Sequence, residues 1–174
     1  MKTGKTSKFV IATWGCKTAL IFAFGLVSAM AMAAEFSGLV VGVNDGDTIK
    51  ILDDTHHAHT VRLMGIDAPE KGQAWGQRSK QSLSDLVFQK TVSVQWSKRD
   101  KYGRIVGKVL TLEGTDICLE QITKGMAWHY KKYAGEQPAD DRGQYADAEE
   151  IARESGVGLW QDVAPMPPWV WRHR

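Results

Sequence analysis

The stretch Thr48-Ile-Lys-Ile-Leu52 and, after a polar tip, Val61-Arg-Leu63 decides the fold. Apolar and polar residues alternate in both segments, which is typical of β-strands with one buried face. The polar residues between them, 53–57, favour a turn, so the two segments predict a β-hairpin. Because the apolar residues on either side of Arg62 would face the core, Arg62 should point to the other side of the sheet.

The hairpin leads into Arg62-Leu-Met-Gly-Ile-Asp-Ala-Pro-Glu70, which brings one arginine and two carboxylates together. Strand-forming residues end at Gly65, and Pro69 excludes a regular helix or a central strand. We therefore expect Asp67 and Glu70 to lie on a fixed turn. Taken alone, the segment is more typical of an ordinary surface turn than of a site, since Asp and Pro form such turns readily.

Other segments complete a predicted fold of the α+β class. Alternating or β-branched residues predict further strands at 36–43, 91–96 and 104–112, and helical spacing of apolar residues predicts helices at 73–88, 116–124 and 142–155. A hairpin-rich order of five strands, with one helix after the third and the others after the fifth, favours a small five-stranded OB-fold barrel with about three helices.

The N-terminal residues 1–33 have the pattern of a signal peptide. Lysines precede an apolar run that ends Ala31-Met-Ala33, and we expect cleavage after Ala33. The alternative is an uncleaved membrane anchor, but the run is short for a span. We expect export to the periplasm or the medium, no stable membrane association after cleavage, a barrel domain at 34–164 and an extended Pro/Trp-rich tail at 165–174.

Charge and cysteine content restrict the functions of the mature chain. The leader holds four of the 22 Lys and Arg residues and no acid, so 18 basic residues remain against 20 acidic ones. Binding to a polyanion must therefore come from a local cluster and not from net charge. Cys118 is the only mature cysteine, which excludes an intrachain disulfide and favours a buried thiol.

Three short motifs occur in order along the predicted barrel: Asp45-Gly-Asp-Thr48, Arg62 to Glu70, and Asp100-Lys-Tyr-Gly-Arg104. In combination and spacing they resemble the thermonuclease family, the homologues of staphylococcal nuclease. The resemblance extends over about residues 37–160 of this chain. It implies the fold already predicted and an enzyme that hydrolyses phosphodiester bonds.

The resemblance implies a Ca²⁺ site. Asp47 and Asp67 are then side-chain ligands, and Ala68 is a ligand through its carbonyl, although staphylococcal nuclease has Thr at this position. A backbone ligand tolerates that difference. An all-oxygen site suits a hard cation such as Ca²⁺, whereas zinc prefers His or Cys.

The resemblance also implies the catalytic residues. Glu70 would be the general base for an attacking water, and Arg62 and Arg104 would bind the scissile phosphate. Guanidinium groups match phosphate oxygens bidentately, which agrees with this assignment. Each residue also has an ordinary interpretation in isolation; for example, Arg104 could pair with Asp100 on the surface.

Substrate contacts are expected at Lys101 and Tyr102 by the same resemblance, the lysine for a backbone phosphate and the ring for a base. A basic and aromatic patch at Trp128-His-Tyr-Lys-Lys-Tyr133 supplies the local cluster that net charge does not, and Tyr133 is the candidate binding tyrosine. By contrast, His56, His57 and His59 lie at a hairpin tip and indicate an exposed polar turn.

Two functions remain to be distinguished. The first is a monomeric, Ca²⁺-dependent nuclease that cuts DNA and RNA with little sequence preference, on single strands or frayed duplexes, and leaves 3′-phosphates. The second is a non-catalytic OB-fold module that only binds single strands. The presence of Glu70 favours the enzyme, because a binding module has no use for a general base.

Overall fold

The computed structural model describes Met1, Gly4 and residues 34–174, and residues 34–174 belong to one compact unit. The predicted leader and its cleavage site lie outside the described residues. Among the described residues, no helix combines the length and the hydropathy required to cross a bilayer.

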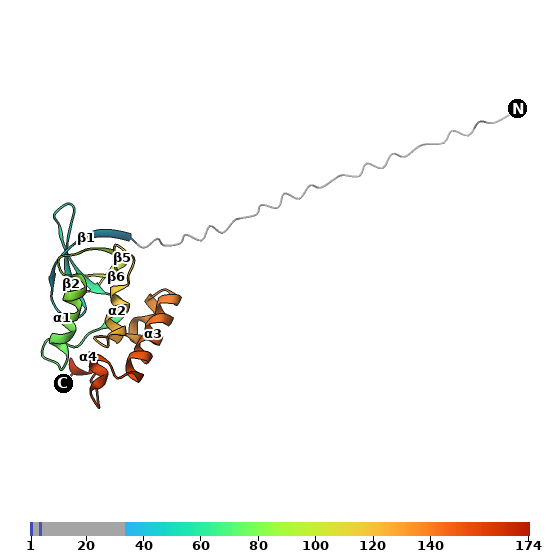
Figure 1. Cartoon of the computed structure of the whole chain (residues 1–174). Helices are drawn as coiled ribbons and strands as arrows, with labels where there is room; N and C mark the ends of the chain where they lie inside the picture. The colour runs from blue at the N-terminus through green and yellow to red at the C-terminus, as the bar shows by residue number, and fades with distance from the viewer. Residues whose placement is uncertain (2–3, 5–33) are drawn as a thin grey trace. The chain divides into compact units, whose positions relative to one another are not determined.

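Five strands close into a barrel in the order β1-β2-β3-β6-β5, which confirms the predicted architecture (Figure 1). All neighbouring pairs are antiparallel except β3 and β6, which run parallel. Their bounds are β1 Ala34–Val43, β2 Thr48–Asp53, β3 Ala58–Leu63, β5 Thr91–Arg99 and β6 Ile105–Thr111.

The hairpin that predicted the fold supplies the centre of the core. Ile49, Ile51, Val61 and Leu63 are at most 1% exposed, and β2 pairs with β3 so that Thr48 lies opposite Arg62. Burial of each such side chain contributes about 1.5–3 kcal/mol relative to exposure. The same alternation directs Arg62 away from the core, as the sequence predicts.

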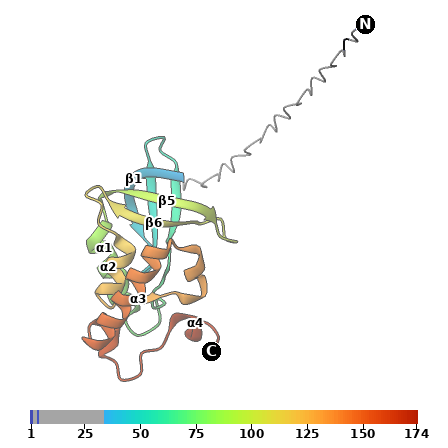
Figure 2. The ribbon, with the colours of Figure 1, turned by 90° about the vertical axis from the view of Figure 1, so that its right-hand side faces the viewer.

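Helices lie beside the barrel, and in both views the β2–β3 hairpin and the C-terminus are at opposite ends of this unit (Figure 2). The three predicted helices are present, with bounds α1 Gly76–Val87, α2 Ile117–Thr123 and α3 Ala139–Glu154. Two 3₁₀ segments, η1 Lys131–Glu136 and η2 Gly158–Gln161, follow α2 and α3. A two-stranded sheet joins β4 (Ile66–Asp67) to β7 (Trp128–His129).

The C-terminal tail is not extended throughout, so that prediction is wrong for part of it. Residues Pro168–Trp171 form a short helix, α4, with Pro167 in an extended conformation before it. A proline excludes a helix only where its missing N–H or its ring interrupts an earlier turn. At the first helical position neither matters, so Pro168 begins α4 instead of preventing it.

Two regions outside the site can be compared with the sequence predictions. The Cys118 thiol is fully buried, and burial raises its pKa well above the ordinary value. At the hairpin tip, His56 and His57 are exposed as predicted. His59 is not on the exposed turn: it lies in β3, is 16% exposed and forms a 2.7 Å hydrogen bond with Asp53. Neither region therefore has the character of a reactive or metal-binding site.

Candidate active site

A cleft of about 690 Å³ lies where β3, the turn after it and the β5–β6 loop meet. It is lined by every site residue predicted from the sequence, although these residues come from four separate segments. The nine residues are Asp47, Arg62, Asp67, Ala68, Glu70, Lys101, Tyr102, Arg104 and Tyr133.

The turn before β2 places Asp47 at the cleft. Gly46 approaches α1 so closely that a Cβ at this position would lie 1.9 Å from Ser79 Oγ. Its carbonyl accepts a 2.8 Å hydrogen bond from Nε2 of Gln121, a fully buried side chain on α2. The two helices thus fix the backbone beside Asp47, and sequence reasoning had assigned no role to Gln121.

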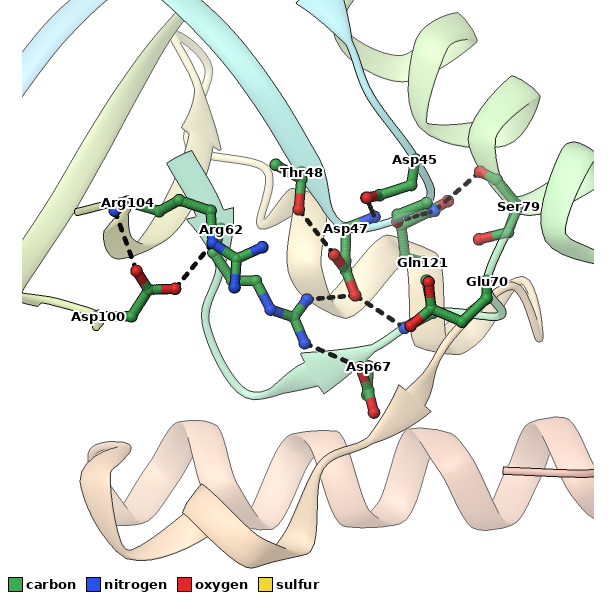
Figure 3. A network of polar contacts seen from close by, with 12 residues as sticks. Asp45, Asp47, Thr48, Arg62, Asp67, Glu70, Ser79, Asp100, Arg104 and Gln121 are labelled. Atoms are coloured by element: carbon green, nitrogen blue, oxygen red, sulfur yellow. Dashed lines mark hydrogen bonds and ion pairs between the residues drawn. The ribbon is translucent and has the colours of Figure 1, made fainter. Parts of the chain in front are cut away.

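Asp47 and Asp67 converge on the guanidinium of Arg62 (Figure 3). Nη1 of Arg62 forms an ion pair with Asp47 Oδ2, and Nη2 lies 2.8 Å from Asp67 Oδ1. Asp47 Oδ2 also accepts a 2.9 Å hydrogen bond from the Ala68 amide. The two predicted metal ligands and one predicted phosphate-binding residue are therefore in direct contact.

Glu70 lies at the edge of the same cluster, in a turn that Gln73, just before α1, stabilises. Its amide donates to Oε1 of Gln73 at 3.1 Å, and its carbonyl accepts from the Gln73 amide at 2.9 Å. Only glycine fits at position 76, because a Cβ there would lie 1.9 Å from the Glu70 carbonyl oxygen. The side chain is 38% exposed, so it is accessible to water.

Arg104 faces the cleft from the β5–β6 loop, which Asp100 organises. Asp100 Oδ1 accepts from the amides of Tyr102 and Arg104, and Oδ2 accepts from Arg104 Nε at 2.7 Å. Arg104 therefore does form the ion pair with Asp100 that its sequence position alone would suggest. It occupies only Nε, so the terminal Nη groups have no hydrogen-bond acceptor among the described residues.

The aromatic edge of the cleft is smaller than the sequence predicts. Tyr133 is 44% exposed and Tyr102 is 72% exposed, as surfaces for stacking require. Trp128 and His129 are buried in β7, which pairs with β4, so the prediction that they belong to a binding patch is wrong. The pairing of β7 with β4 therefore buries two of the six residues of this local sequence pattern.

The cleft lining is balanced in formal charge, with six acidic and six basic side chains, and the environment differs from one carboxylate to the next. Burial and then the charge of Asp47 raise the pKa of Asp45 to about 6. Burial alone would raise the pKa of Asp47, but the positive charge of Arg62 and hydrogen bonds from Ala68, Arg62 and Thr48 together hold that pKa below its usual value. Burial raises the pKa of Asp67 against the opposing hydrogen bond from Arg172.

The donor chemistry of the cleft fits a hard cation. Among the residues the structure describes, no three His, Cys, Asp or Glu side chains are grouped as a metal site made by side chains alone. The cleft lining contains neither His nor Cys, which does not fit zinc. Two carboxylates that contact one guanidinium fit Ca²⁺, which completes roughly 6–8 oxygen ligands with carbonyls and water.

One residue of the cleft was missed from the sequence. Arg172, from the turn that ends α4, contacts both Asp67 and Glu70. It lies about a hundred positions from either carboxylate, and the Pro/Trp-rich segment around it indicated only packing. No periodicity or motif connects it to the cleft.

Comparison with known proteins supplies independent information. The sequence model of the family described as "Staphylococcal nuclease homologue" matches residues 60–162. An "Uncharacterized endonuclease" of Escherichia coli is 40% identical over 143 residues, which cover 82% of this chain and 89% of that protein. A "Micrococcal nuclease" of Shigella flexneri is 40% identical over 155 residues, 84% of this chain and 86% of that protein. An "Uncharacterized endonuclease" of Haemophilus influenzae is 40% identical over 157 residues, covering 90% and 84%.

Proposed function

Because the chain belongs to the staphylococcal nuclease homologue family and is a nuclease by that membership, we propose that it is a Ca²⁺-dependent enzyme that cuts DNA and RNA with low sequence specificity. The observation that carries this proposal is the cleft itself. Residues that the sequence places in four separate segments line one volume of about 690 Å³, with carboxylates and guanidinium groups in contact.

Asp47 and Asp67 would hold the cation with their carboxylates, and Ala68 with its carbonyl. A bound Ca²⁺ supplies positive charge to the phosphate oxygens that become more negative during attack. The fit rests on the all-oxygen donor set and on the approach of the Asp47 and Asp67 carboxylates to one another around Arg62, beside the Ala68 backbone.

Glu70 would accept the proton of the attacking water. It is the one predicted catalytic carboxylate with substantial exposure, and its turn is fixed by Gln73 and Gly76. A positioned base of this kind contributes about 10²–10⁴-fold to a rate. The reaction breaks a P–O bond and, by resemblance to the family, leaves a 3′-phosphate and a 5′-hydroxyl.

Arg104 and Arg62 would bind the phosphate from two sides. Arg104 retains its Nη donors for a bidentate contact with phosphate oxygens. Arg62 is only 14% exposed and is bound to both metal-ligand candidates, so it also holds those carboxylates in position. We infer that Arg104 makes the more accessible contact.

Single strands or frayed duplexes fit the edge of the cleft better than closed duplexes. Tyr102 and Tyr133 present exposed rings, and Lys101 lies 5.0 Å from the Tyr102 ring centroid. Stacking of an unpaired base on such a ring contributes about 1–3 kcal/mol. A competition assay with single-stranded and double-stranded oligonucleotides measures this preference.

We also propose export to the periplasm or the medium through residues 1–33. The Lys-rich start, the apolar run and the small residues before position 34 support it. The expected result is a secreted protein that begins after Ala33. Recovery of Met1 in the membrane fraction would instead favour an uncleaved anchor.

A cleavage assay on the purified mature protein tests the proposal. We expect cleavage of DNA and RNA with added Ca²⁺ and none with excess chelator. Glu70→Gln should lose about 10²–10⁴-fold in rate, and Arg104→Ala about 10²–10³-fold. The matched controls are Glu150→Gln and Arg142→Ala, exposed residues of α3 that should keep full activity. Undiminished cleavage by Glu70→Gln, or in chelator, would contradict the mechanism.

A further inference from the structure

Arg172 reaches the cleft from the C-terminal tail and binds two carboxylates. Its Nη2 lies 2.7 Å from Asp67 Oδ2, and its Nη1 lies 3.2 Å from Asp67 Oδ1 and 2.7 Å from Glu70 Oε1. Asp67 is a candidate metal ligand and Glu70 is the candidate base. One guanidinium therefore bridges the two groups on which the proposed reaction depends.

The tail is held in this position by packing and not only by charge. Trp169 is stacked on Tyr130, with ring centroids 5.4 Å apart and planes 15° apart, and meets Trp128 at 5.6 Å. The Met166 carbonyl accepts a 2.5 Å hydrogen bond from Gln73, the residue that also binds the Glu70 amide. Arg172 follows directly as the residue that caps α4.

The bidentate contact leaves no oxygen of Asp67 uncommitted. Oδ1 is shared between Arg62 and Arg172, and Oδ2 is bound by Arg172. The Asp67 side chain is only 1% exposed, so water cannot replace these contacts easily. A buried carboxylate requires positive charge or hydrogen-bond donors close by, and here guanidinium groups supply both.

A cation and Arg172 therefore compete for the same atoms. A Ca²⁺ ligand distance is about 2.3–2.6 Å, so an ion bound to Asp67 Oδ2 would lie within about 5 Å of the Arg172 Nη2 that is 2.7 Å from the same oxygen. Two positive groups at one oxygen also repel each other. The tail must withdraw Arg172 from Asp67 before that carboxylate can bind a cation.

We propose that Arg172 belongs to the site as an internal counter-ion, which occupies Asp67 and Glu70 in the cation-free protein and is displaced when the cation binds. The apparent cation affinity is then the intrinsic affinity multiplied by the fraction of molecules in which Arg172 has left Asp67. In the cation-free state, the Arg172 guanidinium also links Glu70, the candidate base, to Asp67, the candidate cation ligand. This inference rests on the cation site proposed above and assigns the tail a part in its regulation.

Calorimetric titration with Ca²⁺ alone, without nucleic acid, tests the competition. Arg172→Ala should bind Ca²⁺ about 5- to 100-fold more tightly than the wild type, the usual size of a coupling between sites. The matched control is Arg174→Ala, which removes the same charge from the same tail. Arg174 lies over the Trp171 ring at 5.1 Å and has no carboxylate partner among the described residues, so its variant should stay within about twofold of the wild type by charge screening.

Thermal unfolding gives a second readout that does not depend on activity. Without Ca²⁺, Arg172→Ala should unfold at a lower temperature, because Asp67 loses its main partner. Saturating Ca²⁺ should then raise its midpoint more than that of the wild type. Arg172→Lys retains the charge but not the bidentate contact, and we expect an intermediate affinity from it even if the alanine variant folds poorly.

The outcomes separate this inference from the proposed function. Equal or weaker Ca²⁺ binding by Arg172→Ala, with normal binding by the wild type, overturns the counter-ion inference alone. A change of the same size in Arg174→Ala also overturns it, because the effect would then be one of net charge. No Ca²⁺ binding by any folded variant, including the wild type, overturns the cation site itself.

Discussion

Two clusters of carboxylates lie on this domain and differ in what binds them. In the cleft, Asp67 is bound by guanidinium groups of side chains. Between β6, α2 and α3, Asp116 accepts from the amides of Cys118 and Leu119 at 2.9 and 3.1 Å, and from the Tyr145 hydroxyl at 2.8 Å.

The difference separates function from stability. Main-chain donors at the start of α2 cannot leave Asp116 without loss of the helix cap, so that cluster is part of the fold. The guanidinium groups around Asp67 belong to flexible side chains, one of them from the tail. Such partners can be exchanged for a cation or a phosphate while the barrel remains folded.

The largest expected effect is that of Asp67→Asn. If Asp67 is a cation ligand as proposed, its loss should lower kcat/KM on the order of 10³-fold or more, because the stabilisation that a cation supplies is worth several kcal/mol. Folding should be affected much less, since Arg62 retains Asp47. Parallel cleavage assays and urea denaturation measure the two effects; a fall in stability as severe as the fall in rate would contradict the contrast between the clusters.

Gln121→Leu is expected to have the next largest effect, because this buried residue holds the Gly46 backbone beside Asp47 in the cleft. Its Nε2 donates to the carbonyls of Gly46 and Ser79, and its removal would leave the Gly46 carbonyl without this donor. We expect a loss of about 1–3 kcal/mol in stability and about 10- to 100-fold in activity, as for residues that orient ligands. Gln144→Leu, on the exposed surface of α3, is the control and should change neither quantity.

Asp116→Ala should lower stability and leave catalysis nearly unchanged. It removes the cap of α2 and the partner of the Tyr145 hydroxyl, a loss of about 1–2 kcal/mol. The midpoint of urea unfolding measures it, and the cleavage rate at 25 °C is the internal control. A rate below about one tenth of the wild type would show that the Asp116 cluster is coupled to the cleft, since a variant that stays folded should keep the residues of the cleft in place.

The smallest effect concerns Lys108, which binds Asp141 at 2.7 Å and Asp116 at 3.3 Å. Burial alone would lower the pKa of Lys108, but hydrogen bonds and charge from Asp141 and Asp116 raise it above 10.5. A raised lysine pKa stabilises the fold below about pH 10 and loses this contribution as the pH rises through the folded-state value. The stability difference between wild type and Lys108→Met should therefore shrink between about pH 9 and pH 12. A stability difference between wild type and Lys108→Met that grows from about pH 9 to pH 12 would contradict a raised pKa for Lys108.

Much of the fold was predictable because its signals are local. The alternation in β2 and β3 follows from the geometry of a strand, and Asp116 at the start of α2 follows from the need to cap free amides. Errors occur where distant segments meet. Trp128 and His129 resemble a surface patch in sequence, yet their pairing with β4 buries them.

The sequence by itself determined the barrel and the main helices, because periodicity and caps act over a few neighbouring positions. It also indicated nine residues of the cleft, through the resemblance of short motifs to a known family. Only the tertiary structure decided that Arg62 joins Asp47 to Asp67, that Gln121 supports the turn beside them, and that Arg172 arrives from the tail. These contacts join segments far apart in the chain. Their partners are selected by packing and by the burial of charge, which no local pattern records.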